Sequence, residues 1–144
     1  KVVIPKTVSY IGEDAFRECV DLEEFTARDG VGEIESCAFA YCTSLKEVVL
    51  LNPRGYLGDS VFYGCTALER VDIAAYSFSY GTFSYCTSLK EITIRRGWWQ
   101  MIISADSFYG CENITTVYFD GTERQWRYVL GDKSIFDGKV IFLK

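Results

Sequence analysis

The sequence contains six cysteines, whose thiols could act as nucleophiles, ligate a metal ion or form disulfides. Five of them recur at regular distances along the chain: Cys19, Cys42, Cys65, Cys86 and Cys111. Such recurrence is typical of a small apolar side chain that fills the core of a repeating fold, where free cysteine is common. Cys37 stands outside the series and is interpreted as a further small core residue. Because no Cys-x-x-Cys pair occurs, we expect neither a metal nor a cofactor.

Acid–base catalysis finds little support in the residue types. The 144 residues include no histidine, which is the commonest general base at neutral pH and the commonest metal ligand. Glutamate and aspartate are numerous, but a glycosidase needs two carboxylates that face each other across a cleft, and their spacing here indicates a solvated surface instead. We therefore expect no catalytic residue and predict that the chain is not an enzyme.

Aromatic and arginine side chains form the strongest binding candidates. The stretch "RRGWWQMII" (95–103) places two tryptophans behind two arginines, and similar residues stand at corresponding places of earlier segments. Such side chains dominate binding hot spots. The predicted ligand-binding residues are Arg54, Tyr56, Tyr76, Arg95, Arg96, Trp98 and Trp99. Since adjacent residues of an extended segment point to opposite sides, one tryptophan could instead be core, and we expect at least one to face solvent.

These candidates lie between the copies of an internal repeat. The aligned segments are "AFRECVDLEEF" (15–25), "AFAYCTSLKEVVL" (38–50), "VFYGCTALERVDI" (61–73), "TFSYCTSLKEITI" (82–94) and "SFYGCENITTVYF" (107–119). Each reads small-Phe-x-x-Cys-x-x-Leu/Ile-x-x-apolar, and the phenylalanines are separated by 23, 23, 21 and 25 residues. One unit cannot bury its apolar residues alone, whereas stacked units can, so the repeat predicts a solenoid.

The end of each unit alternates between apolar and polar residues, as in "LKEVVL" (45–50), which predicts a half-buried strand. Stacked at about 4.8 Å, such strands form a parallel sheet on one side, with a short helical turn at each Phe-x-x-Cys on the other. The expected outward rows are Glu24, Glu47, Arg70, Glu91 and Thr116; then Thr26, Val49, Asp72, Thr93 and Tyr118; then Arg28, Leu51, Ala74, Arg95 and Asp120. The predicted fold class is an α/β repeat solenoid of five to six units.

The opening unit "IPKTVSYIGEDAFRECVDLEEF" (4–25) resembles the BspA-type leucine-rich repeat, whose pattern runs Ile-Pro-x-x-Val-x-x-Ile-Gly-x-x-Ala-Phe-x-x-Cys-x-x-Leu. The resemblance covers residues 2 to about 119, although the Ile-Pro and Ile-Gly elements are lost in later units. It implies a right-handed leucine-rich-repeat coil. It also implies a bacterial or protist surface protein that adheres to host extracellular matrix or to other cells.

Residues 120–144 depart from the repeat and are expected to form a C-terminal cap in the same domain as the array at 1–119. Thr122 is the expected N-cap of a helix that begins at Glu123, and a closing strand is expected at 139–143. The run "GTERQW" (121–126) is similar to the Gly-Thr-x-x-Gln-Trp run with which the family often ends. The chain begins at Lys1 in mid-pattern, so we expect it to be a fragment or a processed chain.

Charge and hydropathy narrow the expected partners. The 20 acidic and 15 basic residues are scattered without a basic stripe, so nucleic acid is not expected, and no apolar run has the length of a membrane span. We expect a non-catalytic recognition or adhesion module of a cell-surface or secreted protein that binds a protein or glycan through strand-edge loops. The alternatives are a structural spacer or stalk in a larger exported protein, or the targeting module of a cell-wall enzyme. The oligomeric state stays open.

Overall fold

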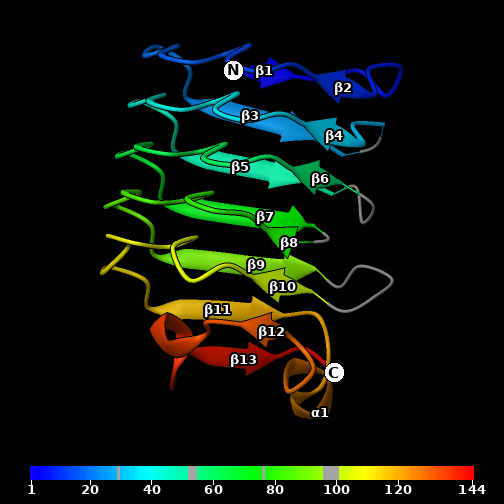
Figure 1. Cartoon of the computed structure of the whole chain (residues 1–144), viewed down its shortest axis with the longest axis vertical. Coiled ribbons are helices and arrows are strands. Elements are labelled where there is room, and N and C mark those ends of the chain that lie inside the picture. Colours follow the sequence, from blue (N-terminus) through cyan, green and yellow to red (C-terminus); the bar gives the residue numbers. More distant parts are fainter. Residues whose placement is uncertain (29, 52–54, 76, 96–100) are drawn as a thin grey trace.

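The chain folds as a solenoid whose coils are stacked along one axis (Figure 1). The computed structural model describes residues 1–28, 30–51, 55–75, 77–95 and 101–144. One long strand from each coil enters a seven-stranded parallel sheet, in the order β1-β3-β5-β7-β9-β11-β13. The sheet occupies one side of the stack and the turns of the repeat occupy the other. The predicted parallel-sheet solenoid is therefore confirmed.

The elements follow the repeat closely. The strands of the long sheet are β1 (Val2–Val3), β3 (Glu24–Ala27), β5 (Glu47–Leu50), β7 (Arg70–Ala74), β9 (Glu91–Arg95), β11 (Thr116–Phe119) and β13 (Val140–Phe142). The short strands are β2 (Tyr10–Ile11), β4 (Glu33–Ile34), β6 (Tyr56–Leu57), β8 (Ser77–Phe78), β10 (Ile102–Ile103) and β12 (Leu130–Gly131). The helical segments are α1 (Glu123–Trp126) and the 3-10 helix η1 (Ser134–Phe136).

The register of the long sheet agrees with the rows expected from the alternation. Glu24 pairs with Glu47, and the same row continues through Arg70, Glu91 and Thr116. The next row inward, which includes Phe25, Val48 and Val71, is buried. Because side chains alternate with a period of two, one correct core assignment fixes the phase of a strand. Ala74 departs from the expected outward row, since it is buried at the end of β7.

The short strands form two further sheets, in the orders β2-β4-β6 and β8-β10-β12. Their second residues are apolar and buried in the first five of these strands: Ile11, Ile34, Leu57, Phe78 and Ile103. The sequence shows an apolar residue at this place in every unit, but two residues are too few to display a strand periodicity. Each coil therefore contains two strand segments, of which the sequence predicts only the longer.

A ladder of stacked phenylalanine rings forms the centre of the core. Successive centroids of Phe16, Phe39, Phe62, Phe83 and Phe108 are 5.0, 5.3, 5.4 and 5.3 Å apart. The planes of each pair differ by at most 17°. The three central rings are wholly inaccessible to solvent. Burial of one such side chain stabilises the fold by roughly 1.5 to 3 kcal/mol, so the ladder is a main source of stability.

The Phe-x-x-Cys segments form single hydrogen-bonded turns, and in the described repeats none of these turns extends into a helix. The amide of Cys42 donates to the carbonyl of Phe39 at 3.3 Å, for example. Cys37 and Tyr41 in the same coil adopt left-handed φ angles of 57° and 60°. Left-handed residues cannot continue a right-handed helix, so they limit each segment to one turn.

The C-terminal end of the core is covered by the segment that follows β11. Thr122 caps α1 in a capping box with Gln125, and the ring of Trp126 lies 5.0 Å from that of Phe119. Phe136 of η1 packs against Phe108, the last ring of the ladder, with centroids 5.0 Å apart. Strand β13 then pairs with β11 and ends the sheet. In the part of the chain that the structure describes, no helix has the length and apolar character needed to cross a bilayer.

Candidate binding surfaces

Most of the predicted ligand-binding residues lie outside the described residues: Arg54, Tyr76, Arg96, Trp98 and Trp99. Along the chain they fall between the long strand of a coil and the short strand that follows it. The two described candidates flank the same kind of connection, since Tyr56 begins β6 and Arg95 ends β9. The strand-edge site therefore stays a prediction, with two of its residues placed by the structure.

Arg95 is exposed but already paired. Its Nε and Nη2 donate to Oδ1 and Oδ2 of Asp72 at 2.6 and 2.8 Å. This hydrogen bonding raises the pKa of the Arg95 guanidinium above its usual value. The bidentate geometry fixes the orientation of the guanidinium plane. A partner would therefore meet an oriented ion pair at the end of β9, not a free cation.

Tyr56 belongs to a row of outward side chains on the sheet formed by β2, β4 and β6. It pairs with Glu33, which pairs in turn with Tyr10. Both tyrosines are about half exposed, at 49% for Tyr56 and 53% for Tyr10. Sequence reasoning missed Tyr10, although its place before the buried Ile11 signals an outward residue. Tyr56 and Arg95 lie in different sheets, so the structure does not join them in one row.

The outward face of the long sheet is polar and its charges are largely paired. Lys1 Nζ lies 2.7 Å from Glu24 Oε2, and Arg70 Nε lies 3.7 Å from Glu47 Oε1. The hydrogen bond from Lys1 lowers the pKa of the Glu24 carboxyl and raises that of Lys1 itself. These exposed pairs are typical of a solvated surface.

Four of the five repeating cysteines are buried, as the sequence predicts. The thiols of Cys42, Cys65, Cys86 and Cys111 donate to the carbonyl oxygens of Phe16, Phe39, Phe62 and Phe83 at 2.9 to 3.2 Å. Burial raises the pKa of Cys42 to about 12 and that of Cys86 well above its usual value. The Cys42 and Cys86 thiols, held protonated in this way, are poor nucleophiles and metal ligands.

Cys19 departs from that prediction, because it is exposed in the first coil although it occupies the same repeat position. Cys37 is partly buried, and this burial raises the pKa of its thiol. All six cysteines are free. Across the described ranges, no group of three or more cysteine, aspartate or glutamate side chains is placed to hold a metal ion.

The turn side carries an aromatic surface that sequence reasoning missed. Tyr41, Tyr63, Tyr85 and Tyr109 come from consecutive coils, with centroids 5.4, 5.3 and 5.4 Å apart and planes tilted by 64° to 79°. We name these four residues the tyrosine ladder. The signal in the sequence is a tyrosine between Phe and Cys in four successive units, in "FAYC", "FYGC", "FSYC" and "FYGC".

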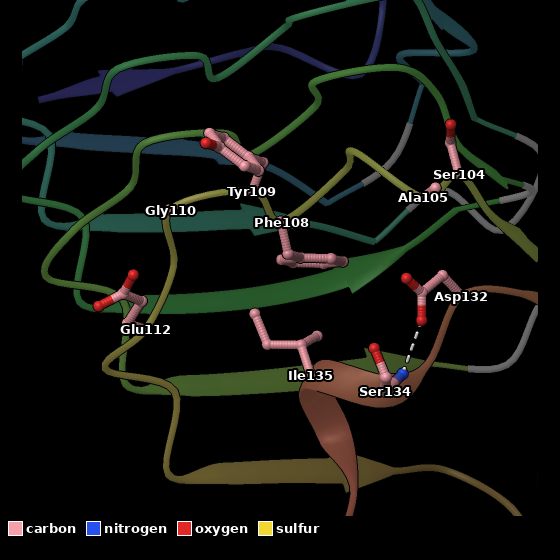
Figure 2. Close-up of a pocket in the computed structure, with 9 residues that line it drawn as sticks. All are labelled: Ser104, Ala105, Phe108, Tyr109, Gly110, Glu112, Asp132, Ser134 and Ile135. Carbon is pink, nitrogen blue, oxygen red and sulfur yellow. Dashed lines mark hydrogen bonds between the residues drawn. The ribbon is translucent and has the colours of Figure 1, made fainter.

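Two hollows flank the last rung of this ladder. The first, of about 250 Å³, is lined by Tyr63, Tyr80, Gly81, Ser84, Tyr85, Asp106 and Tyr109. The second, of about 270 Å³, lies between the last repeat and the cap and is shown in Figure 2. Its polar residues include Glu112 and Asp132, and the Asp132 carboxylate accepts a 2.9 Å hydrogen bond from the Ser134 amide. This bond lowers the pKa of Asp132 below its usual value. Tyr109 lines both hollows.

Comparison with known proteins identifies the repeat. The chain is similar to the crystal structure of a leucine-rich cell surface protein from Faecalibacterium prausnitzii A2-165, with 26% identity and a TM-score of 0.77. The match covers 92% of this chain but only 35% of that protein. A leucine-rich repeat protein from Bacteroides ovatus ATCC 8483 is 22% identical with a TM-score of 0.40, over 97% of this chain and 54% of that one.

No curated protein is significantly similar to the chain. The sequence profile of the BspA-type leucine-rich repeat region matches residues 1–114 in six copies. This agrees with the repeat unit, the parallel sheet and the phenylalanine ladder described above. The family is a repeat fold used for binding or structure rather than typically for catalysis. The chain belongs to the BspA-type leucine-rich repeat family.

Proposed function

We propose that this chain is a non-catalytic recognition and adhesion module of a cell-surface or secreted protein. It binds a protein, such as a host matrix or cell-surface protein, or a glycan through the connections that follow the long strands. The predicted contact residues are Arg54, Tyr56, Tyr76, Arg95, Arg96, Trp98 and Trp99.

One observation carries the proposal: the frame repeats from coil to coil while the strand edge does not. The buried phenylalanine and cysteine positions recur with near-constant spacing. At the strand edge, by contrast, β7 ends in a buried Ala74 while its neighbour β9 ends in an exposed Arg95 at the paired position. A constant frame with varied edge residues suits recognition over an extended surface.

The cellular setting rests on similarity. The F. prausnitzii protein with the same fold is a leucine-rich cell surface protein, which supports a surface location for this chain as well. The match covers about a third of that protein's length. The surface location and the adhesive activity are therefore proposed for this chain and are not transferred from that protein.

Binding of the purified domain to a panel of immobilised matrix proteins and glycans tests the proposal. The test variant is the double substitution Trp98→Ala, Trp99→Ala. Tyr41→Ala is the matched control, because Tyr41 is a 41% exposed aromatic residue on the turn side of the solenoid, outside the connections that follow the long strands. We expect the double variant to lose at least about tenfold in affinity, since aromatic hot spots contribute 2 kcal/mol or more. The control should bind like the parent.

Circular dichroism and a urea unfolding curve show whether each variant is folded. Loss of binding in a folded double variant supports an adhesive module with its hot spot at the connection after β9. Equal binding by both variants contradicts that placement. Binding to no member of the panel favours the spacer or stalk instead.

A further inference from the structure

We propose that the turn side of the solenoid, at Tyr109, binds a guanidinium or ammonium group carried by a basic segment of a partner protein. This site is distinct from the strand-edge surface and does not depend on it. The inference rests on the exposure of the tyrosine ladder, on an intramolecular cation contact at its other end, and on the charge of the two hollows beside Tyr109.

Tyr109 presents the most exposed ring of the ladder. It is 61% exposed, whereas Tyr41 and Tyr85 are 41% and 42% exposed. Tyr80, which shares the first hollow with Tyr109, is also 61% exposed. Within the described ring contacts, Tyr109 touches only Tyr85, in an edge-on arrangement at 5.4 Å. An exposed aromatic ring beside a hollow is the type of surface that anchors a partner side chain.

The opposite end of the ladder already shows how a cation packs against it. In the first coil, the residue after Phe is Arg17, where the third and fifth coils have Tyr63 and Tyr109. The Arg17 guanidinium lies 5.7 Å from the centroid of the Tyr41 ring, within the range of a cation–π contact. The part of the chain that the structure describes places no cation over Tyr109. At Tyr109 the preceding coil contributes Tyr85 instead of a cation, and the rest of the 61% exposed ring is open to a cation from another molecule.

The charge beside Tyr109 is complementary to a cation. Asp106 lines the first hollow, and Glu112 and Asp132 line the second, while no lysine or arginine among the described residues lines either one. The three carboxylates do not converge as metal ligands. They line two hollows that share the Tyr109 ring, an arrangement that suits a large, weakly hydrated cation such as guanidinium. Lys133, the nearest base along the chain to Asp132, is engaged with the carbonyl oxygen and ring of Trp126.

The two hollows also suggest how a segment lies. They share Tyr109 as a common wall and measure about 250 and 270 Å³. In Figure 2, Glu112 and Asp132 stand on opposite sides of the second hollow, with Tyr109 above it. A basic side chain in either hollow contacts Tyr109 and a carboxylate together. Alternating basic residues of one extended segment can occupy both.

The probe is a capped, fluorescein-labelled octapeptide of alternating arginine and glycine, titrated with the domain and followed by fluorescence anisotropy. The matched probe replaces arginine with citrulline, which keeps the shape and removes the charge. The test variants are Tyr109→Leu and Asp106→Asn. The controls are Tyr10→Leu and Glu33→Gln, an exposed tyrosine and an exposed acid paired on the sheet of β2 and β4.

We expect the arginine peptide to bind the parent and the citrulline peptide to bind at least about tenfold more weakly. Tyr109→Leu weakens binding by about tenfold, Asp106→Asn by severalfold, and each control by less than twofold. The Trp98→Ala, Trp99→Ala variant is expected to bind the peptide like the parent. The result of this test is therefore independent of whether the strand-edge connections bind a partner.

Four results overturn the proposal. The first is that the parent does not bind the arginine peptide. The second is that the citrulline peptide binds as tightly as the arginine peptide, which is the result expected of a site for neutral ligands such as glycans. The third is that a folded Tyr109→Leu variant binds like the parent, which would mean that the ring is not the contact. The fourth is that Glu33→Gln weakens binding as much as Asp106→Asn, which would make the attraction a general effect of the acidic surface.

Discussion

The first coil and the middle coils carry the same signature residues, but they bury them differently. Phe62 is wholly buried between Phe39 and Phe83, whereas Phe16 is only partly buried and stacks on Phe39 alone among the described rings. Cys86 is buried, and its counterpart Cys19 is exposed. The residue types are equal, so the difference comes from the neighbours. In a solenoid, burial is a property of the interface between coils and not of a single coil.

The largest expected effect of this difference is on thiol reactivity. We expect iodoacetamide at pH 8 to modify Cys19 in the folded chain of residues 1–144 at least about a thousandfold faster than Cys86. The reason is that exposure of Cys86 needs an opening that approaches global unfolding, which costs about 5 to 15 kcal/mol. Peptide mass spectrometry over time measures both rates, and equal rates in concentrated urea provide the control. Similar native rates contradict the structure of the first coil.

The next effect is on stability. Phe62→Ala removes a ring from the middle of the ladder and is expected to lower the free energy of unfolding by about 3 to 5 kcal/mol. Phe16→Ala is expected to cost less than half as much, because that ring is partly solvated and has one stacking partner. Urea unfolding of both variants gives the comparison, with unchanged m-values as the check on two-state behaviour. A Phe16→Ala variant that unfolds as early as Phe62→Ala disproves the role of the neighbour.

Alkaline pH is expected to lower the stability of the fold through a buried thiol, Cys42. The pKa of Cys42 is about 12 in the fold, above the value of roughly 8.5 for an exposed thiol. The folded state therefore keeps a proton that the unfolded chain releases. This contribution to stability is complete below about pH 8.5 and is lost as pH rises toward 12, by up to about 1.4 kcal/mol per pH unit.

Urea unfolding between pH 7 and 10 checks this expectation. The difference in stability between the parent and Cys42→Ala should shrink as pH rises above 8.5. If the stability of Cys42→Ala falls with rising pH as steeply as that of the parent, this thiol is not the cause of the loss of stability at alkaline pH.

These contrasts also explain which parts of the fold the sequence predicts. The first two rows of the long sheet are correct because a period of two, applied to five similar segments, fixes the phase of each strand once the core residue is known. The third row is wrong at Ala74, which is buried at the end of β7. The exposure of Cys19 is missed because the first unit matches the repeat pattern well, and the pattern carries no information about the adjacent coil. Two-residue strands such as β2 and β6 are missed because two residues are too few to show the alternation that identifies a strand.

The tyrosine ladder is missed for a different reason: its members shift between two positions of the repeat. Tyr41 and Tyr85 are the second residue after Phe, while Tyr63 and Tyr109 are the first, so alignment by column conceals the series. The glycines that follow explain the shift. A Cβ at Gly64 would come within 2.8 Å of the Tyr41 ring, and Gly64 also has a left-handed φ of 69°. Each glycine leaves space for the tyrosine of the preceding coil.

The smallest expected effect concerns the surface ion pairs, which the stacking should influence least. Asp72 and Arg95 form a bidentate pair between two middle coils, and Lys1 and Glu24 form a single contact at the first. Arg95→Gln is expected to lower the free energy of unfolding by no more than about 1 kcal/mol, and by less in 1 M NaCl. Lys1→Gln is expected to leave the urea midpoint unchanged.

The Arg95→Gln variant also links stability to recognition. A large loss of stability would mean that the pair with Asp72 supports the sheet, and Arg95 would then be a structural residue rather than a contact residue. If the variant unfolds like the parent but loses binding to a partner identified in the panel, the guanidinium acts on the partner. The two roles are separable because Arg95 remains substantially exposed while its plane is held by Asp72.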